Sequence, residues 1–104
     1  MTVPALRPLE GIRVIELGQL LAGPFAGTML AYFGAEVIKV EPPGGDPIRG
    51  WRVVRDGASL WYRSLGRNKK SVTLDLKTEK GRDLVLKLFD SSLYLNIFCL
   101  LISL

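Results

Sequence analysis

The fold is predicted most clearly by residues 11–41, which read GIRVIELGQLLAGPFAGTMLAYFGAEVIKVE. Residues 12–17 are sufficiently rich in apolar and β-branched side chains for a strand and lie between two glycines, which predicts a first strand. Pro24 suits the first turn of a helix, and apolar residues then recur at helical spacing up to Gly34, a typical C-cap residue. A second strand is expected over residues 36–41. Together these signals predict a strand–helix–strand unit with two parallel strands.

The remainder of the chain continues this pattern. Residues 42–58 contain three prolines and several glycines, which predicts a long loop. A short helix capped by Ser59 is expected up to residue 65, then a third strand over residues 71–76 and a helix over residues 78–88. The order β-α-β-loop-α-β-α predicts the α/β class with an open parallel sheet.

Composition narrows the chemistry. The chain has 104 residues, of which 48% are hydrophobic and 23% charged, as in one small globular domain. It contains no histidine, which excludes Ser-His-Asp and Cys-His dyads and every His-ligated metal site. Its one cysteine, Cys99, can form neither an internal disulfide nor a Cys-rich zinc site. We therefore expect no metal site and a cytoplasmic location, and residues 1–10 lack the pattern of a signal peptide.

Positive charge is concentrated in residues 49–70. This stretch holds seven Lys and Arg residues against the single acid Asp56, a net charge of +6. An anionic partner and a solvated basic loop both fit such a run of charge. A basic module that binds nucleic acid is a further hypothesis. However, no RRM, KH or zinc-finger pattern accompanies the stretch, and we expect no nucleic-acid partner.

The carboxyl-terminal residues 91–104 are uncharged, and ten of these fourteen residues are apolar. The segment is shorter than the roughly 20 residues that span a bilayer, so no membrane span is expected. A buried strand, a core helix and an exposed apolar tail remain open. An exposed tail would favour self-association.

Two segments are candidates for ligand binding, because open α/β sheets bind ligands at the carboxyl ends of their strands. The turn after the first strand, residues 18–24, is rich in small residues but matches neither the dinucleotide fingerprint nor the P-loop. Its glycines could equally serve tight helix packing. The cations of residues 67–70 could hold a phosphate. On the third strand, Asp75 and Lys77 share a face and could instead pair with each other.

Several motifs, taken in order, resemble the amino terminus of the class III CoA-transferases. This is the CaiB/BaiF group, which includes formyl-CoA transferase and α-methylacyl-CoA racemase. The resemblance covers residues 8–88, and residues 89–104 diverge as an apolar tail. It rests on PLEGIRVIEL (8–17), LAGP (21–24), GAEVIKVEP (34–42), GGDP (44–47) and NKKSVTLDLK (68–77).

The resemblance implies a Rossmann-like large domain, of which this chain is the truncated amino-terminal part, in an interlocked homodimer. It implies transfer of CoA between an acyl-CoA and a small carboxylic acid, with 2-methylacyl-CoA racemisation as the sibling chemistry. CoA or acyl-CoA is then the substrate, and no covalently bound cofactor is implied. The backbone at Leu21 and Ala22 would line the thioester pocket. The adenine nucleotide would lie against Leu74, Asp75, Leu76 and Lys77.

The chain also departs from the family pattern at two points. Pro42 stands where the family often has an arginine that touches a CoA phosphate. The family's nucleophile is an aspartate beyond residue 104, which forms an acyl anhydride and then an aspartyl-CoA thioester. We therefore expect no catalytic residue here and an inactive, truncated fragment. A non-catalytic CoA-binding or dimer-interfering fragment is the alternative.

Overall fold

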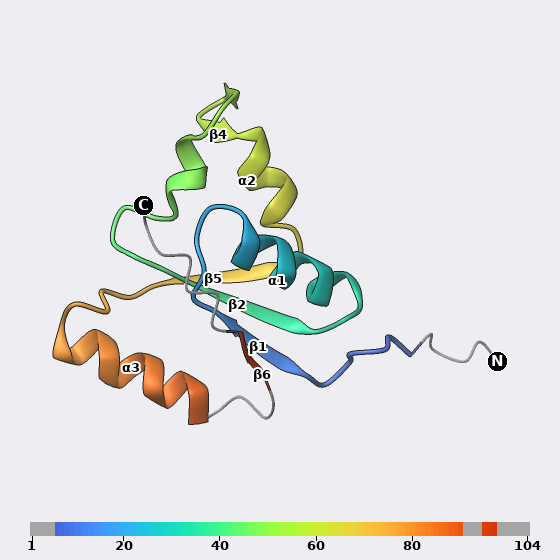
Figure 1. Ribbon diagram of the computed structural model, residues 1–104, viewed down its shortest axis with the longest axis vertical. Helices are drawn as coiled ribbons and strands as arrows, with labels where there is room; N and C mark the ends of the chain where they lie inside the picture. Colours follow the sequence, from blue (N-terminus) through green and yellow to red (C-terminus); the bar gives the residue numbers. More distant parts are fainter. Residues whose placement is uncertain (1–5, 91–94, 98–104) are drawn as a thin grey trace.

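The computed structural model describes residues 6–90 and the backbone of residues 95–97. Four parallel strands form one sheet in the order β5-β2-β1-β6 (Figure 1). Helices α1 (Ala22–Tyr32) and α3 (Glu79–Asp90) pack against the sheet. This arrangement confirms the predicted α/β class with an open parallel sheet. The strands are β1 (Arg13–Glu16), β2 (Glu36–Glu41), β5 (Lys69–Thr73) and β6 (Leu95–Ile97).

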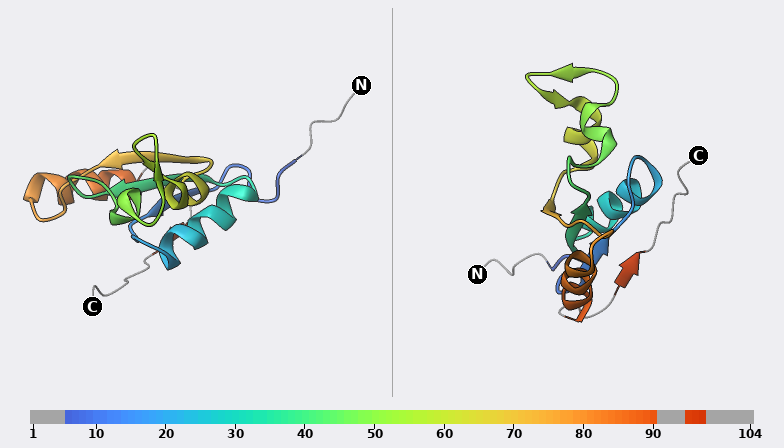
Figure 2. Two further views of the ribbon diagram at one scale, coloured as in Figure 1. Left: turned by 90° about the horizontal axis from the view of Figure 1, so that it is seen from above. Right: turned by 90° about the vertical axis from the view of Figure 1, so that its left-hand side faces the viewer.

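The two faces of the sheet carry separate apolar clusters, because side chains alternate between faces along a strand. Val14 and Val37 lie side by side in the register and pack with Ala31 of α1. Ile15 and Val40 instead pack with Val85 of α3. The helices α1 and α3 therefore cover opposite faces, and they lie apart in both views of Figure 2.

Helix α1 forms where the sequence predicts it, although it begins two residues before Pro24. Proline is tolerated in the first turn because the first backbone N–H groups of a helix have no partner inside it. The helix ends before Gly34, whose φ of +102° lies in the left-handed region that glycine enters most easily. Gly34 is therefore the expected stop signal.

Residues 42–58, predicted as a long loop, contain further structure. A 3₁₀ helix, η1 (Pro47–Gly50), is followed by a hairpin of β3 (Val54–Arg55) and β4 (Ala58–Ser59) and then by α2 (Leu60–Leu65). Asp56 and Gly57 both have positive φ, as a two-residue hairpin turn requires. Ser59 caps α2 as predicted, because its Oγ accepts the backbone N–H of Tyr62 at 3.3 Å. The hairpin and α2 project from the sheet at the top of Figure 1.

The third strand of the large sheet was predicted over residues 71–76, and this prediction is wrong by two to three residues. Strand β5 runs from Lys69 to Thr73, paired with β2 from Val37 to Glu41. It ends at Thr73 because β2 ends at the partner residue Glu41. Residues 74–77 consequently lie outside the sheet and lead into α3.

The backbone of residues 95–97 forms β6, which pairs in parallel with β1. Of the three alternatives for the apolar tail, a strand is therefore realised over these residues, and the rest of the tail lies outside the described residues. In the part of the chain that the structure describes, no helix is long and apolar enough to cross a membrane.

Candidate functional site

The first cavity, which we term the strand-end pocket, lies at the carboxyl ends of β1, β2 and β5. Its volume is about 200 Å³. Ligands of open α/β sheets bind at this end of the strands. All four residues expected to meet the adenine nucleotide line it. The lining residues are Leu17, Gln19, Val40, Glu41, Pro42, Leu74, Asp75, Leu76 and Lys77.

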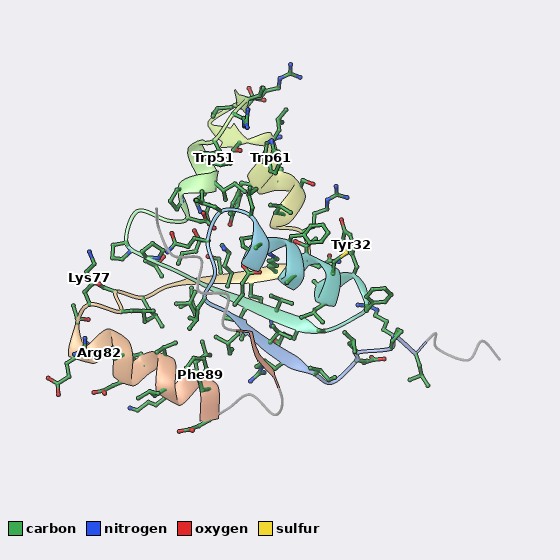
Figure 3. All side chains as sticks on the ribbon, in the orientation of Figure 1. Tyr32, Trp51, Trp61, Lys77, Arg82 and Phe89 are labelled. Atoms are coloured by element: carbon green, nitrogen blue, oxygen red, sulfur yellow. The ribbon has the colours of Figure 1, made fainter. Side chains whose placement is uncertain are left out.

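The wall formed by residues 74–77 is a hydrogen-bonded turn. Leu74 N donates to the carbonyl of Glu41 at 2.9 Å, and Lys77 N donates to Asp75 Oδ1 at 3.0 Å. Asp75 and Lys77 therefore do not share a strand face as predicted, because β5 has already ended. Arg82 Nη1 donates to the Lys77 carbonyl at 3.1 Å, and Figure 3 shows Lys77 in the turn that leads into α3 and Arg82 near the start of that helix.

A second cavity, the helix cleft, lies between the amino-terminal end of α1 and α2. It has a volume of about 300 Å³ and an apolar lining. Leu21 and Ala22, the residues expected near the thioester, belong to it. Trp61, labelled on α2 in Figure 3, closes the opposite side. The lining residues are Leu21, Ala22, Phe25, Trp61 and Leu65.

The loop between β1 and α1 separates the two cavities. Gln19 lines the strand-end pocket, whereas Leu21 lines the helix cleft. Leu20, between them, has a φ of +64°, which is uncommon for a residue with a side chain. Its backbone N–H donates to Asp46 Oδ1 at 3.1 Å. The predicted site residues thus fall into two neighbouring cavities, and the β1–α1 loop contributes to the lining of both.

Beneath this loop lies a buried ionic cluster of Glu16, Lys39, Asp46 and Lys69. Lys39 Nζ lies 2.9 Å from Glu16 Oε2 and 2.7 Å from Asp46 Oδ2. Lys69 Nζ lies 2.7 Å from Glu16 Oε1 and donates to the carbonyl of Pro24 at 2.7 Å. The cluster holds two cations and two anions, so its formal charge is zero.

The two lysines of this cluster respond differently to burial. Burial alone would lower the pKa of Lys39, but the carboxylates of Asp46 and Glu16 outweigh it and raise that pKa. Burial lowers the pKa of Lys69, and Glu16 only partly offsets this effect. Lys39 is thus the more firmly charged of the two, because it contacts two carboxylates.

A second polar group surrounds Glu41 at the end of β2. Arg49 binds both of its carboxylate oxygens at 2.7 Å, and Ser71 Oγ donates at 2.6 Å. Chiefly because of Arg49, the pKa of Glu41 falls to about 2. The Arg49 guanidinium also stacks on the ring of Tyr62, 3.9 Å from its centre. Glu41 therefore lines the strand-end pocket as an ionised carboxylate that already has hydrogen-bond partners.

These contacts correct the interpretation of the basic stretch. Lys69 pairs with Glu16, and Lys70 pairs with Glu36 at 2.5 Å, so two of the three cations of residues 67–70 already have carboxylate partners, which disfavours a phosphate site at these two lysines. Arg49 is likewise neutralised by Glu41. The exposed cations of the stretch that remain available lie around the hairpin and α2. They are Arg52, Arg55, Arg63 and Arg67.

Sequence reasoning missed the buried cluster, although a signal was present. Glu16 and Lys39 each stand two residues after a buried valine of the same strand, Val14 and Val37, which places both charges on the face covered by α1. Gly27 supports the packing interpretation of the small residues, because a Cβ there would lie 2.0 Å from Glu16 Oε1. Asp46 carries a local signal as the N-cap of η1, but its contact with Lys39 had none.

Comparison with known proteins gives consistent matches. The model of CoA-transferase family III matches residues 9–92. Succinyl-CoA–D-citramalate CoA-transferase of Chloroflexus aurantiacus is 61% identical over 84 residues, which are 79% of this chain and 21% of that protein. Human succinyl-CoA:glutarate CoA-transferase is 46% identical, over 80% of this chain and 19% of that protein.

A solved structure agrees with these matches. A CaiB/BaiF family protein from Brucella suis superimposes with a TM-score of 0.77 at 40% identity, over 85% of this chain and 25% of that chain. The chain thus spans about a fifth of the length of the curated relatives described above. The resemblance noted in the sequence is confirmed by an independent family model and by a shared fold. On this basis the chain belongs to CoA-transferase family III.

Proposed function

We propose that this chain is the CoA-binding, amino-terminal part of an acyl-CoA:carboxylate CoA-transferase. The observation that carries the proposal is the grouping of the implied CoA-contacting residues. Residues 74–77 line the strand-end pocket, and Leu21 and Ala22 line the adjoining helix cleft. CoA is itself a nucleotide joined to a long thiol-bearing arm, so two neighbouring cavities suit its two ends.

The strand-end pocket suits an adenine ring. Its apolar residues, which include Val40 and Leu74, can cover the faces of a flat base, and Asp75 and Lys77 supply polar groups at the rim. Lys77 is exposed and can approach a phosphate of the nucleotide. With Pro42 in the place of the family arginine, this lysine is the cation that we assign to the CoA phosphates.

The helix cleft suits the thioester end of the ligand. Its lining is apolar, and the backbone at Leu21 and Ala22 forms the edge nearest the strand-end pocket. Exclusion of water from such a cleft would protect a thioester from hydrolysis. The acyl group would therefore lie between α1 and α2.

The transfer reaction itself requires more than this chain contains. In the reaction, the carboxylate acceptor becomes a thioester, and the carboxylic acid of the donor is released. The resemblance assigns the nucleophile to an aspartate beyond residue 104. We therefore propose that the chain binds CoA and its esters without turning them over. The relatives are named for succinyl-CoA, D-citramalate and glutarate, and dicarboxylic acids are the substrate class that we propose for the whole enzyme.

A homodimer and a cytoplasmic location belong to the same proposal. The homodimer follows from the resemblance, and the cytoplasmic location follows from the single cysteine and the lack of a signal-peptide pattern in residues 1–10. Light scattering after size-exclusion chromatography tests the dimer. A racemase-like member of the family is the second candidate, and a deuterium-exchange assay at the 2-position of a 2-methylacyl-CoA distinguishes it in the complete protein.

Calorimetric titration with CoA tests the binding proposal. Leu76 is 38% exposed and lines the strand-end pocket, whereas Leu86 is 56% exposed on α3 and lies outside both cavities. We expect Leu76→Glu to weaken CoA binding at least about tenfold, because a carboxylate would face the nucleotide phosphates. Leu86→Glu should leave binding unchanged. Absence of binding to the wild-type chain, or equal effects of the two substitutions, would refute the proposed site.

Turnover is tested separately. The chain should show no exchange of labelled succinate into succinyl-CoA, because the implied nucleophile lies outside it. Measurable exchange that tracks the purified chain would contradict this part of the proposal. Its loss in a variant of one of the aspartates would then identify the nucleophile within these 104 residues.

A further inference from the structure

Asp46 is a buried carboxylate in the glycine-rich loop after β2. Only 1% of its surface is exposed. Its Oδ1 accepts the backbone N–H of Leu20 at 3.1 Å and that of Ile48 at 3.0 Å, and its Oδ2 lies 2.7 Å from Lys39 Nζ. Its own backbone N–H donates to Glu41 Oε2 at 2.7 Å. One side chain therefore ties the β1–α1 loop to β2 and to η1.

The loop that Asp46 holds is strained at the bonded residue. Leu20 has a φ of +64°, a conformation in which a side chain clashes with its own backbone. Such a conformation persists only where surrounding contacts enforce it. The hydrogen bond to Asp46 is such a contact, and Lys39 in turn fixes the carboxylate from below.

Leu20 lies between the residues that line the two cavities. The residue before it, Gln19, lines the strand-end pocket, and the residue after it, Leu21, lines the helix cleft. A change in the backbone conformation of Leu20 would therefore move Gln19 and Leu21, and with them parts of the two linings, relative to each other. A ligand that occupies both cavities depends on that alignment, whereas a ligand confined to one of them does not.

We propose that Asp46 is a positioning residue, which holds Leu20 in its left-handed conformation and so aligns the strand-end pocket with the helix cleft. The proposal rests on the proposed CoA-binding function and adds to it. Asp46 touches no ligand in this account. It acts through the backbone of Leu20, and its effect should appear only for ligands that reach from one cavity into the other.

Two probes separate this role from a general effect on folding. Adenosine 3′,5′-bisphosphate carries only the nucleotide end of CoA and would occupy the strand-end pocket. Acetyl-CoA carries the same nucleotide together with the thioester arm and would occupy both cavities. Calorimetry of the full chain measures the affinity for each probe, and circular dichroism measures the folded fraction of every variant.

In Asp46→Ala, we expect the affinity for acetyl-CoA to fall at least about fivefold, while that for the bisphosphate stays within about twofold. Asp46→Asn retains an acceptor oxygen for Leu20 and should recover most of the loss. Asp83→Ala, an exposed position on α3, is the control and should change neither affinity. Equal losses for both probes in Asp46→Ala would mean that Asp46 is merely structural and would overturn the proposal.

A double-mutant cycle with Leu20→Gly tests the route of the effect. Glycine adopts positive φ without a clash, so the loop no longer needs the anchor to the same degree. The loss of acetyl-CoA affinity caused by Asp46→Ala should therefore be smaller in the Leu20→Gly background. Losses that simply add would show that Asp46 does not act through Leu20.

Hydrogen exchange supplies a measurement on the wild-type chain that does not depend on whether Asp46→Ala folds. The Leu20 amide should be protected and should remain protected in Asp46→Asn. An unprotected Leu20 amide in the folded chain would overturn the proposal. If the wild-type chain binds neither probe, the proposed function fails as well; if it binds the bisphosphate but acetyl-CoA no more tightly, only the alignment proposal falls.

Discussion

Gly81 in the first turn of α3 is the most direct test of how the strand-end pocket is built. A Cβ at this position would lie 1.9 Å from the Asp75 carbonyl oxygen and 2.6 Å from its carbon. Both are backbone atoms of the turn that forms one wall of the pocket, so no side chain can rotate away. In Gly81→Ala, α3 and the turn would have to separate by about 1.5 Å to restore ordinary contact.

Two effects of opposite sign determine how much Gly81→Ala changes the free energy of unfolding. Alanine favours a helix over glycine by about 1 kcal/mol, whereas forcing an extra methyl into a packed site costs about 1–3 kcal/mol. Because the clash is with backbone, we take the upper half of that range and expect a net loss of about 1–2 kcal/mol. For a domain of this size, such a loss lowers the melting temperature by roughly 4–16 °C.

Thermal unfolding followed by circular dichroism measures this loss. Gly50→Ala at the end of η1 is the matched control, because a Cβ there meets nothing within 4 Å. Its melting temperature should change little. Gly81→Ala should also bind CoA more weakly, because the displaced turn carries Leu76 and Lys77. A Gly81→Ala chain as stable as the wild type would refute the packing argument.

Three further predictions concern the polar contacts. The pKa of Glu41 is lowered to about 2, so its pairing with Arg49 stabilises the fold fully above about pH 4.5 and is lost as the pH falls through 2. Glu41→Gln should lack up to about 3 kcal/mol of this acid-sensitive stability in urea titrations from pH 6 to 2, and an equal dependence of stability on pH in both proteins would contradict this. Lys39→Met removes the cation between two buried carboxylates and should cost about 3–5 kcal/mol by urea denaturation, so an unchanged midpoint would show that the cluster is not a unit. Ser59→Ala removes the α2 cap and should cost about 1 kcal/mol in the same assay. Ser64 is exposed within that helix, so Ser64→Ala should cost less than half as much, and equal losses would argue against capping.

Local periodicity made most of the elements predictable. The apolar run of β1, the helical spacing after Pro24 and the stop at Gly34 are each encoded within a few neighbouring residues. The end of β5 was not predictable in this way, because Leu74 and Leu76 continue the alternation past Thr73. The strand ends where its partner β2 ends, and pairing between strands is a non-local property.

The family could thus be predicted from the sequence alone, because motifs and periodicity are carried by consecutive residues, and the segments expected to meet CoA stay a prediction of the same kind. Only the tertiary structure decided that Lys69 is a buried partner of Glu16, 53 positions earlier, and not a phosphate ligand. It alone brought Asp46 to the backbone of Leu20, 26 positions away. The physical reason is the same in both cases. The charge of a side chain follows from its residue type, but its partner depends on the register of the strands and the path of the loops.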